Sequence, residues 1–437
     1  MISRRVGRVQ TMAKFSPLDW FKNQTTEASC RTALSENPSL EAAVREIAET
    51  LASKTKADLA LVFASTHYAS DLPRLLPLLR QQISADHWLG CAGGGVIGTK
   101  RNGNAAELEH VPALSVTLLT LPGAILKPFA LDTQDLPDLD NAPQHWQEWV
   151  GADPLHSRSL LLLVDPTSPS INDLISGLDY AYPSSSTIGG IAGPHNAPHG
   201  SLLFEDRVQM GAVGCSIGGE WILEAVVAQG CKPIGPVFAV EQVQRNVVLE
   251  LSHGETKDSP VACLQRVLAD LSEAEREMVK HSLFLGIEKR DFVVSESASA
   301  QSQGAFLVRN LIGVDPSNGA VAVADRVRPG QNVQFLLREA QASRLEAMQL
   351  LEASKVRSSS NPIFALLMAC VGRGSGLYGV PHGDVGIARN VMNDLPIAGV
   401  FCNGEIGPVG GSTHLHGYTA CWGLLRHDPP PHPSTKS

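Results

Sequence analysis

Two charged residues in the last quarter of the chain are the first candidates for ligand chemistry. Arg373 follows the apolar run 365–371, and Glu405 follows the apolar run 396–402. A guanidinium at the end of a strand can hold a carboxylate or phosphate through two hydrogen bonds. Because adjacent strand ends lie about 5 Å apart, Arg373 and Glu405 could bind the two ends of a zwitterion such as an amino acid. The alternatives are that they pair with each other, or that Arg373 is a surface residue paired with Glu405 or Asp384.

Two further sets of residues could support catalysis. His414 and His416 share one face of a predicted strand, where two imidazoles can bind a metal, and Glu405 or Asp384 would complete a mixed site. Cys402 could act as a nucleophile, but it needs a neighbour that lowers the pKa of its thiol. The alternatives are a polar strand that lines a cleft and a buried cysteine. No catalytic residue and no metal site is therefore assigned.

Two short motifs have the spacing of known sites but not the surroundings. Residues 374–379 match G-x-G-x-x-G, yet Pro381 separates the third glycine from the helix predicted to begin near Asp384. Residues 214–218 match the G-x-S-x-G elbow of serine hydrolases, which requires a strand, a turn and a helix. The apolar run after Gly219 is typical of a strand, so a hairpin turn is predicted there instead.

A repeated unit is predicted to position these residues. Three copies each hold an apolar strand, a helix and a glycine-rich segment about 30 residues after the strand begins, which is the length of a β-α-β unit. Their first strands are expected at 59–64, 160–164 and 365–370. Glycine lets backbone approach a ligand closely, and ligands bind at this end of the strands in α/β sheets. The predicted ligand-binding residues are Gly93, Gly94, Gly95, Gly190, Gly193, Arg373, Gly374, Gly404, Glu405, His414 and His416.

The fold class predicted from these patterns is α/β, with a mixed α+β region in the middle of the chain. Between residues 241 and 350 the pattern predicts helices over 260–271 and 272–281, and strands over 306–312 and 332–337. The expected division is a disordered leader over 1–38, domains over 39–240 and 241–425, and a disordered tail over 426–437.

Composition narrows the function classes. The 437 residues are 43% hydrophobic and 18% charged, enough for a large core and too apolar for a disordered chain. No apolar run approaches the ~18 residues of a membrane span. The net charge of −9 argues against nucleic-acid binding. None of the eight cysteines forms a C-x-x-C pair, and no secretory signal is apparent, so a reducing, cytoplasmic location without a cofactor is expected.

The chain resembles the FIST family, named for F-box and intracellular signal transduction. The resemblance covers about residues 40–425 and rests on the runs 89–98, 230–235, 373–374 and 395–408, of which 404–408 (Gly-Glu-Ile-Gly-Pro) is the most specific. It implies two FIST halves packed around a cleft. It also implies a sensory role, with a small ligand such as an amino acid.

Known arrangements of the family suggest the partners to expect. FIST halves occur with signalling proteins, or behind an F-box in ubiquitin-ligase receptors. Residues 1–40 are too short and polar for an F-box, so a stand-alone member is expected. The leading hypothesis is a small-ligand sensor that acts on a signalling or ubiquitin-ligase partner. The alternatives are an F-box-type interaction scaffold and an enzyme that uses Cys402 or a metal at His414 and His416.

Overall fold

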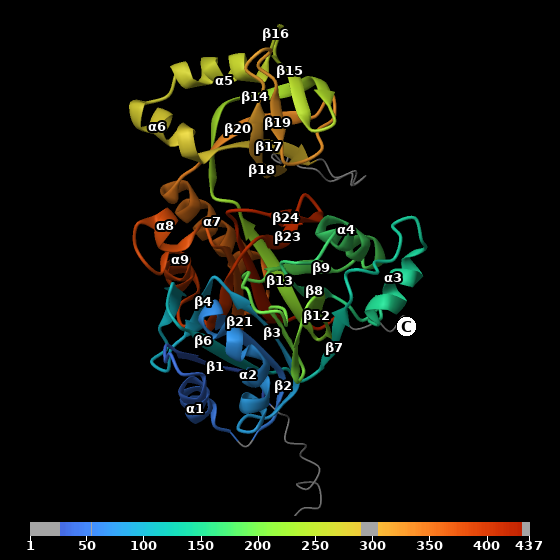
Figure 1. The fold of residues 1–437 in the computed structure, drawn as a ribbon, viewed down its shortest axis with the longest axis vertical. Helices are drawn as coiled ribbons and strands as arrows, with labels where there is room; N and C mark the ends of the chain where they lie inside the picture. The colour runs from blue at the N-terminus through green and yellow to red at the C-terminus, as the bar shows by residue number, and fades with distance from the viewer. Residues whose placement is uncertain (1–26, 54, 290–304, 431–437) are drawn as a thin grey trace, which may run out of the picture.

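The computed structural model describes residues 27–53, 55–289 and 305–430. Figure 1 shows a large body with a smaller β-barrel above it. The chain enters the barrel from β13 (Trp221–Ala228) and leaves it through α7 (Ala340–Arg357). The body consists of three copies of one unit, and the barrel is inserted into the third copy. The predicted α/β class with repeated β-α-β units is therefore confirmed.

Each unit runs in the order edge strand, helix, first strand, helix, second strand, hairpin and return strand. The first unit comprises β1 (Ser29–Ser35), α1 (Leu40–Leu51), β2 (Ala57–Ser65), η2 (Thr66–Asp71), α2 (Leu72–Arg80), β3 (Ala85–Gly93), β4 (Gly95–Thr99), β5 (Ala105–Glu109) and β6 (Leu114–Thr120). The second comprises β7 (Ala124–Leu131), α3 (Pro143–Val150), β8 (Ser159–Val164), α4 (Ile171–Ala181), β9 (Ser186–Ile191), β10 (Leu202–Phe204), β11 (Arg207–Gln209) and β12 (Ala212–Gly219). The third comprises β13, α7, β21 (Phe364–Cys370), α8 (Gly374–Tyr378), α9 (Gly383–Met392), β22 (Ile397–Cys402), β23 (Glu405–Val409), β24 (Ser412–His416) and β25 (Ala420–His427). In every unit the first and second strands are parallel, as a β-α-β crossover requires.

Helix α1 illustrates how sequence sets these elements. Ser39 has an extended backbone and its hydroxyl accepts a hydrogen bond from the Ala42 N–H, which caps the first turn. The apolar residues Leu40, Val44 and Ile47 then recur at helical spacing and are buried. This pattern is typical of a helix with one buried face.

The three units complete one another's sheets by exchanging hairpins. The hairpin β4–β5 of the first unit pairs with β22 of the third, and β10–β11 of the second pairs with β3 of the first. The hairpin β23–β24 of the third unit pairs with β9 of the second. The resulting sheets have the matching orders β1-β6-β2-β3-β10-β11, β7-β12-β8-β9-β23-β24 and β13-β25-β21-β22-β4-β5. Each sheet therefore depends on backbone hydrogen bonds from another unit.

One glycine in the second strand of each unit is required by close packing. A Cβ atom at Gly90 would lie 1.8 Å from the Val62 carbonyl oxygen of the neighbouring first strand. The equivalent distances are 1.6 Å for Gly189 and 1.8 Å for Gly399. Backbone atoms cannot move aside as a flexible side chain can. These three glycines therefore lie within strands, where they let the two parallel strands approach each other.

The inserted barrel is antiparallel. Its order is β14-β20-β17-β18-β19-β15, and it closes because β15 also pairs with β14, while β16 extends β15. The elements are β14 (Cys231–Gln244), β15 (Val247–His253), β16 (Thr256–Asp258), α5 (Pro260–Ala269), α6 (Glu273–Ser282), β17 (Leu283–Lys289), β18 (Ala305–Val314), β19 (Val321–Val323) and β20 (Asn332–Arg338). The two predicted helices and the two predicted strands are present. The predicted boundary at residue 240 lies inside β14.

Three expectations need correction or lie outside the described residues. Residues 29–35, predicted as part of a disordered leader, form β1, because this segment can pair with β6 along its whole length. Strand β25 continues to residue 427, so the tail begins later than predicted. The rest of the predicted leader up to residue 26, and residues 431–437, lie outside the described residues.

The G-x-S-x-G run is also part of a strand. Residues 214–218 lie in β12, and a turn at Glu220 leads into β13, so the strand–turn–helix of a hydrolase elbow is not formed. The predicted hairpin is wrong as well, because β12 pairs with β7 and β8 whereas β13 pairs with β25. Among helices within the described ranges, none combines the length and hydrophobicity needed to span a bilayer.

The strand glycines give a first testable prediction. Gly399→Ala should lower the free energy of unfolding by at least about 2 kcal/mol, because the new Cβ overlaps a backbone carbonyl. The control is Gly386→Ala in α9, where an added Cβ meets nothing within 4 Å. That change should leave stability equal or raise it by up to about 1 kcal/mol. Urea unfolding of both variants measures the difference, and equal stability of the two would contradict the packing argument.

Candidate functional site

The three glycine-rich segments of the units meet in the body. The Gly94 N–H donates to the Phe401 carbonyl at 3.0 Å, and the Gly193 N–H donates to the Ala92 carbonyl at 2.8 Å. The Gly404 carbonyl accepts from the Ile191 N–H at 2.8 Å. The three glycine-rich segments, which stand at matched positions in the units, therefore lie against one another. The backbone groups named here form hydrogen bonds between the segments.

Neighbouring protein atoms occupy the space beside several of these glycines. A Cβ at Gly193 would lie 2.6 Å from the Gly93 carbonyl carbon, and one at Gly190 would lie 2.5 Å from the Cys402 sulfur. A Cβ at Gly374, which has a φ of +55°, would lie 2.5 Å from the Glu109 carboxylate. The glycines serve close packing here. Their predicted contact with a ligand stays a prediction.

Arg373 is buried at the end of β21, where it forms the centre of a polar cluster. Its Nε and Nη2 atoms donate to the two carboxylate oxygens of Asp384 at 2.8 and 2.7 Å. Nη2 also donates to the Tyr378 hydroxyl at 2.6 Å, and Nη1 donates to the Tyr418 carbonyl at 3.1 Å. Asp384 was one of the two predicted partners, but Arg373 is fully buried rather than on the surface. It does not form the alternative pair with Glu405.

Two carboxyl groups near this pair are buried with one oxygen unpartnered. Glu405 Oε2 accepts from the Thr419 N–H at 3.0 Å, and Glu107 Oε1 accepts from the Val385 N–H at 2.7 Å. Their other oxygens, Glu405 Oε1 and Glu107 Oε2, find no hydrogen-bond partner among the described residues. Leaving such oxygens without partners is costly for a charged carboxylate. Both groups are therefore expected to hold a proton near neutral pH.

The electrostatics of the cluster follow from burial. Burial raises the pKa of Glu405 to about 8, and burial together with the charge of Asp384 raises the pKa of Glu107 to about 8. Burial opposes the charge of Arg373, but the Asp384 carboxylate outweighs this effect and raises the Arg373 pKa. The cluster therefore contains one strong ion pair and two neutral acids.

The residues considered for catalysis lack an activating environment. Cys402 is fully buried, and burial raises the pKa of its thiol, which disfavours the nucleophilic thiolate. Burial also lowers the pKa of His414 to about 4 and of His416 to about 3. His416 Nε2 already contacts the Gly407 carbonyl at 2.9 Å. Over the described ranges no three His, Cys, Asp or Glu side chains are grouped as metal ligands.

A pocket of about 520 Å³ lies between the barrel and the body. Its walls come from β13, β14, β18, β20, α7 and the β23–β24 turn, so both parts of the molecule contribute. The lining residues are Ala225, Val226, Val227, Gln229, Cys231, Pro233, Phe306, Val308, Gln334, Leu336, Glu346, Leu350, Arg357, Pro408, Val409 and Gly410. This lining includes none of the predicted ligand-binding residues. Volume, apolar walls and position between two domains are typical of small-molecule sites.

The chain's entry into the barrel is fixed beside this pocket. Gly230, with a φ of +73°, joins β13 to β14. Its N–H donates to the Glu346 carboxylate, and its carbonyl accepts from the Ser343 hydroxyl at 2.9 Å. A Cβ at Gly230 would lie 3.1 Å from Arg373 Nη1. The polar cluster of the body therefore reaches the connection that carries the barrel.

The connection through which the chain leaves the barrel also contacts the body. Arg338, the last residue of β20, donates from Nη1 to the Gly372 carbonyl at 2.9 Å. Its guanidinium lies 4.0 Å from the centre of the Tyr418 ring, a cation–π contact. Both connections to the barrel therefore contact the loops that follow the strands of the third unit.

Several of these residues were not predicted from the sequence. Glu107, Glu346 and Arg338 lie 278, 116 and 34 residues from the partners named above, and no spacing rule links them. Tyr378 is only five residues from Arg373, but no motif signals their contact. The one signal available was composition, because Glu107 is the lone charge in the run 105–108 of a short strand. A single acid in an apolar strand indicates a buried polar partner.

The buried ion pair gives the second prediction. Arg373→Met should lower the free energy of unfolding by about 3–5 kcal/mol, because it leaves the Asp384 carboxylate buried without its cation. The double variant Arg373→Met/Asp384→Leu removes both charges and should recover much of that loss. Urea unfolding at pH 7 measures both. A double variant no more stable than the single variant would show that the pair is not the source of the effect.

The raised carboxyl pKa values give the third prediction. Between pH 4.5 and 8 the folded protein holds protons on Glu405 and Glu107 that the unfolded chain releases. Their contribution to stability is complete below pH 4.5 and is lost as pH rises to 8, at up to about 1.4 kcal/mol per pH unit for each group. Glu405→Gln should make this fall shallower, whereas exposed Glu49→Gln should not. Unfolding curves at several pH values test it, and parallel slopes for the two variants would refute it.

Two family models cover most of the chain. The FIST N domain matches residues 58–254, and the FIST C domain matches residues 260–408. The gap between the matches lies within the barrel, between β15 and α5. An uncharacterized protein of Mycobacterium tuberculosis (strain H37Rv) is 31% identical over 379 residues, which cover 86% of this chain and 93% of the relative. An uncharacterized protein of Mycobacterium bovis is 30% identical over 372 residues, which cover 85% and 91%. Together with the fold, these matches show that the chain belongs to the FIST family, which is associated with signal transduction.

Proposed function

We propose that this FIST protein is a sensor that binds a small metabolite in the pocket between the barrel and the body. The observation that carries the proposal is that the barrel and the body both contribute residues to the walls of the pocket. Val226 and Leu350 come from the body, and Phe306 and Leu336 come from the barrel. A ligand held between them contacts both parts at once. Its binding energy can therefore favour one relative position of the two parts.

The chemistry of the lining suits a small, mainly apolar molecule. At about 25 cal/mol per Å² of buried apolar surface, the aliphatic and aromatic walls supply most of the binding energy. A few polar groups, among them Glu346 and Gln334, set the orientation. Amino acids and related metabolites, which the family resemblance suggests, are the first compounds to test.

The connections to the barrel provide a route from ligand to output. Glu346 lines the pocket and also binds the Gly230 N–H at the entry to the barrel. Arg338 at the exit binds the Gly372 carbonyl of the body. A ligand that contacts Glu346 acts directly on the entry connection. We expect a signalling partner to bind differently according to the resulting position of the barrel. The cytoplasmic location and the ubiquitin-ligase partner stay predictions.

In this proposal, the role of Arg373, Glu405 and the glycine-rich segments is to stabilise the body. Arg373 lies next to Gly230 but is not among the residues that line the pocket, and its donors are taken by Asp384, Tyr378 and Tyr418. The cluster stiffens the base on which the barrel connection lies. Direct ligand contact by these residues is a separate prediction, which binding to the Arg373→Met variant would test.

The fourth prediction concerns occupancy of the pocket. A thermal-shift screen of amino acids, amines and organic acids on the full chain should find a compound that raises the melting temperature. At 100-fold over Kd, specific binding adds about 2.7 kcal/mol of stability. Leu350→Trp fills the pocket from α7 and should abolish the shift. The control is Leu345→Trp, on the same helix but 45% exposed and outside the lining, which should keep it.

Hydrogen exchange adds a second readout for the same compound. Binding should slow exchange of the Gly230 amide and of the amides around Arg338, because a closed pocket restricts both connections. Two results would overturn the proposal. One is a screen of this breadth in which no compound shifts the unfolding temperature, and the other is a binder that Leu350→Trp leaves unaffected.

A further inference from the structure

We propose that the ligand of this pocket is an amine with an apolar body and no carboxylate next to the amine, and that its ammonium group pairs with Glu346. The inference rests on the proposed function and narrows the ligand class. It depends on which polar groups of the lining are free, where the charges lie along α7, and what the remaining walls are made of.

Glu346 is the acid of the pocket and is only partly satisfied. Its Oε2 atom accepts the Gly230 N–H, and it makes no ion pair with any other described residue. Burial raises the pKa of this carboxyl group, whereas the Gly230 hydrogen bond and the charge of nearby Arg373 act in the opposite direction. A half-buried carboxylate of this kind gains most from a cation that enters with the ligand.

The other polar side chains of the lining are largely occupied. The Gln229 amide donates to the Phe306 carbonyl at 2.8 Å and accepts from the Val308 N–H at 2.9 Å. The Gln334 amide nitrogen donates to the Gly235 carbonyl at 2.9 Å. A ligand that enters the pocket therefore meets few free donors, so the lining favours a ligand that donates rather than accepts.

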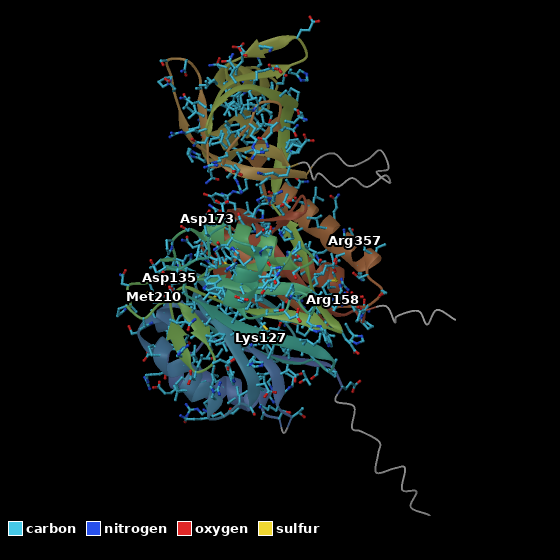
Figure 2. The ribbon with its side chains drawn as sticks, turned by 90° about the vertical axis from the view of Figure 1, so that its right-hand side faces the viewer. Lys127, Asp135, Arg158, Asp173, Met210 and Arg357 are labelled. Atoms are coloured by element: carbon cyan, nitrogen blue, oxygen red, sulfur yellow. The ribbon has the colours of Figure 1, made fainter. Side chains whose placement is uncertain are left out.

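The cation of the lining is too far away to serve an amino acid. Arg357 is eleven residues after Glu346 on α7, about 16 Å along the helix axis. It pairs with Glu224 at 3.2 Å, and its side chain is 65% exposed. Figure 2 shows Arg357 at the outer surface below the barrel. The buried cation near Glu346 is Arg373, but its donors are taken by Asp384, Tyr378 and Tyr418. An α-carboxylate beside the ammonium would therefore face Glu346 and apolar walls without a free cation to pair with it.

The remaining walls fit a hydrocarbon or aromatic body. Phe306 and Val308 from the barrel face a body wall that includes Val226 and Leu350. A protonated amine with an alkyl chain or a ring places its charge at Glu346 and its carbon atoms against these walls. The ammonium would then lie beside the carboxylate that binds Gly230, at the entry to the barrel.

Matched ligands test the charge requirement. The probes are 2-phenylethylamine and n-hexylamine, with phenylalanine, 3-phenylpropionate and hexanoate as their carboxylate-bearing counterparts. Isothermal titration and thermal shift on the full chain should show binding of the two amines. The three counterparts should bind at least about tenfold more weakly, because each places a carboxylate in a site without a free cation.

Variants on one helix test the partner of the ammonium. Glu346→Gln keeps an oxygen to accept the Gly230 N–H and removes the charge, so it should fold normally and bind the amines at least about tenfold more weakly. Glu352→Gln, an exposed change on the same helix, should bind them as the natural protein does. Thermal unfolding without ligand confirms that both variants are folded.

The outcomes separate this inference from the proposed function. If neither amine binds while another compound of the screen binds and is blocked by Leu350→Trp, the pocket is a ligand site and the amine assignment is wrong. Amine binding that Glu346→Gln leaves unchanged, or tighter binding of phenylalanine than of 2-phenylethylamine, also overturns the assignment. A screen without any binder removes both proposals together.

Discussion

Backbone pairing between the hairpin of one unit and the second strand of another holds the body together. Each unit contributes a hairpin to another unit's sheet, so none of the three sheets is complete without a second unit. The exchange brings the ends of the second strands together, and glycines there let the segments bond to each other, as between Gly193 and Ala92. Within each unit, close approach of the two parallel strands explains why a Cβ at Gly90, Gly189 or Gly399 would overlap a carbonyl of the first strand. The glycine-rich segments are therefore part of a packed centre, and the pocket proposed as the ligand site is lined by other residues.

The third unit differs from the others because it carries both the buried ion pair of Arg373 and Asp384 and the barrel. Arg373 and Asp384 form a fully buried ion pair, with Glu405 and Glu107 nearby as acids whose pKa is raised by burial. Such a pair is weak evidence for stability, but breaking it is costly and its geometry is specific. Since Arg373 also lies against Gly230, the cluster defines the position from which the barrel starts.

The junction between barrel and body combines the features expected of a sensor. The pocket draws its walls from both parts, and Glu346 belongs at once to the pocket and to the entry connection. A ligand can shift an equilibrium only by its differential affinity for the two states. Under the proposed sensor function, a ligand that contacts both walls of the pocket would supply such a difference. Cys402, considered as a nucleophile, is disfavoured because burial raises the pKa of its thiol. His414 and His416, considered as metal ligands, belong to no group of three His, Cys, Asp or Glu side chains among the described residues.

The sequence by itself determined the local elements and their repetition. Apolar periodicity, the Ser39 cap and the recurring glycines were enough to predict helices, parallel strand pairs and the α/β class. They also singled out Arg373 as a ligand-binding cation, with pairing to Asp384 or Glu405 as the alternative, and the pair with Asp384 is present. Only the tertiary structure decided which hairpin joins which sheet, that Arg373 is buried, and that Glu346 meets Gly230 across 116 residues. The physical reason is that periodicity reports the face that a residue presents, whereas these contacts depend on long-range pairing between segments that no local pattern encodes.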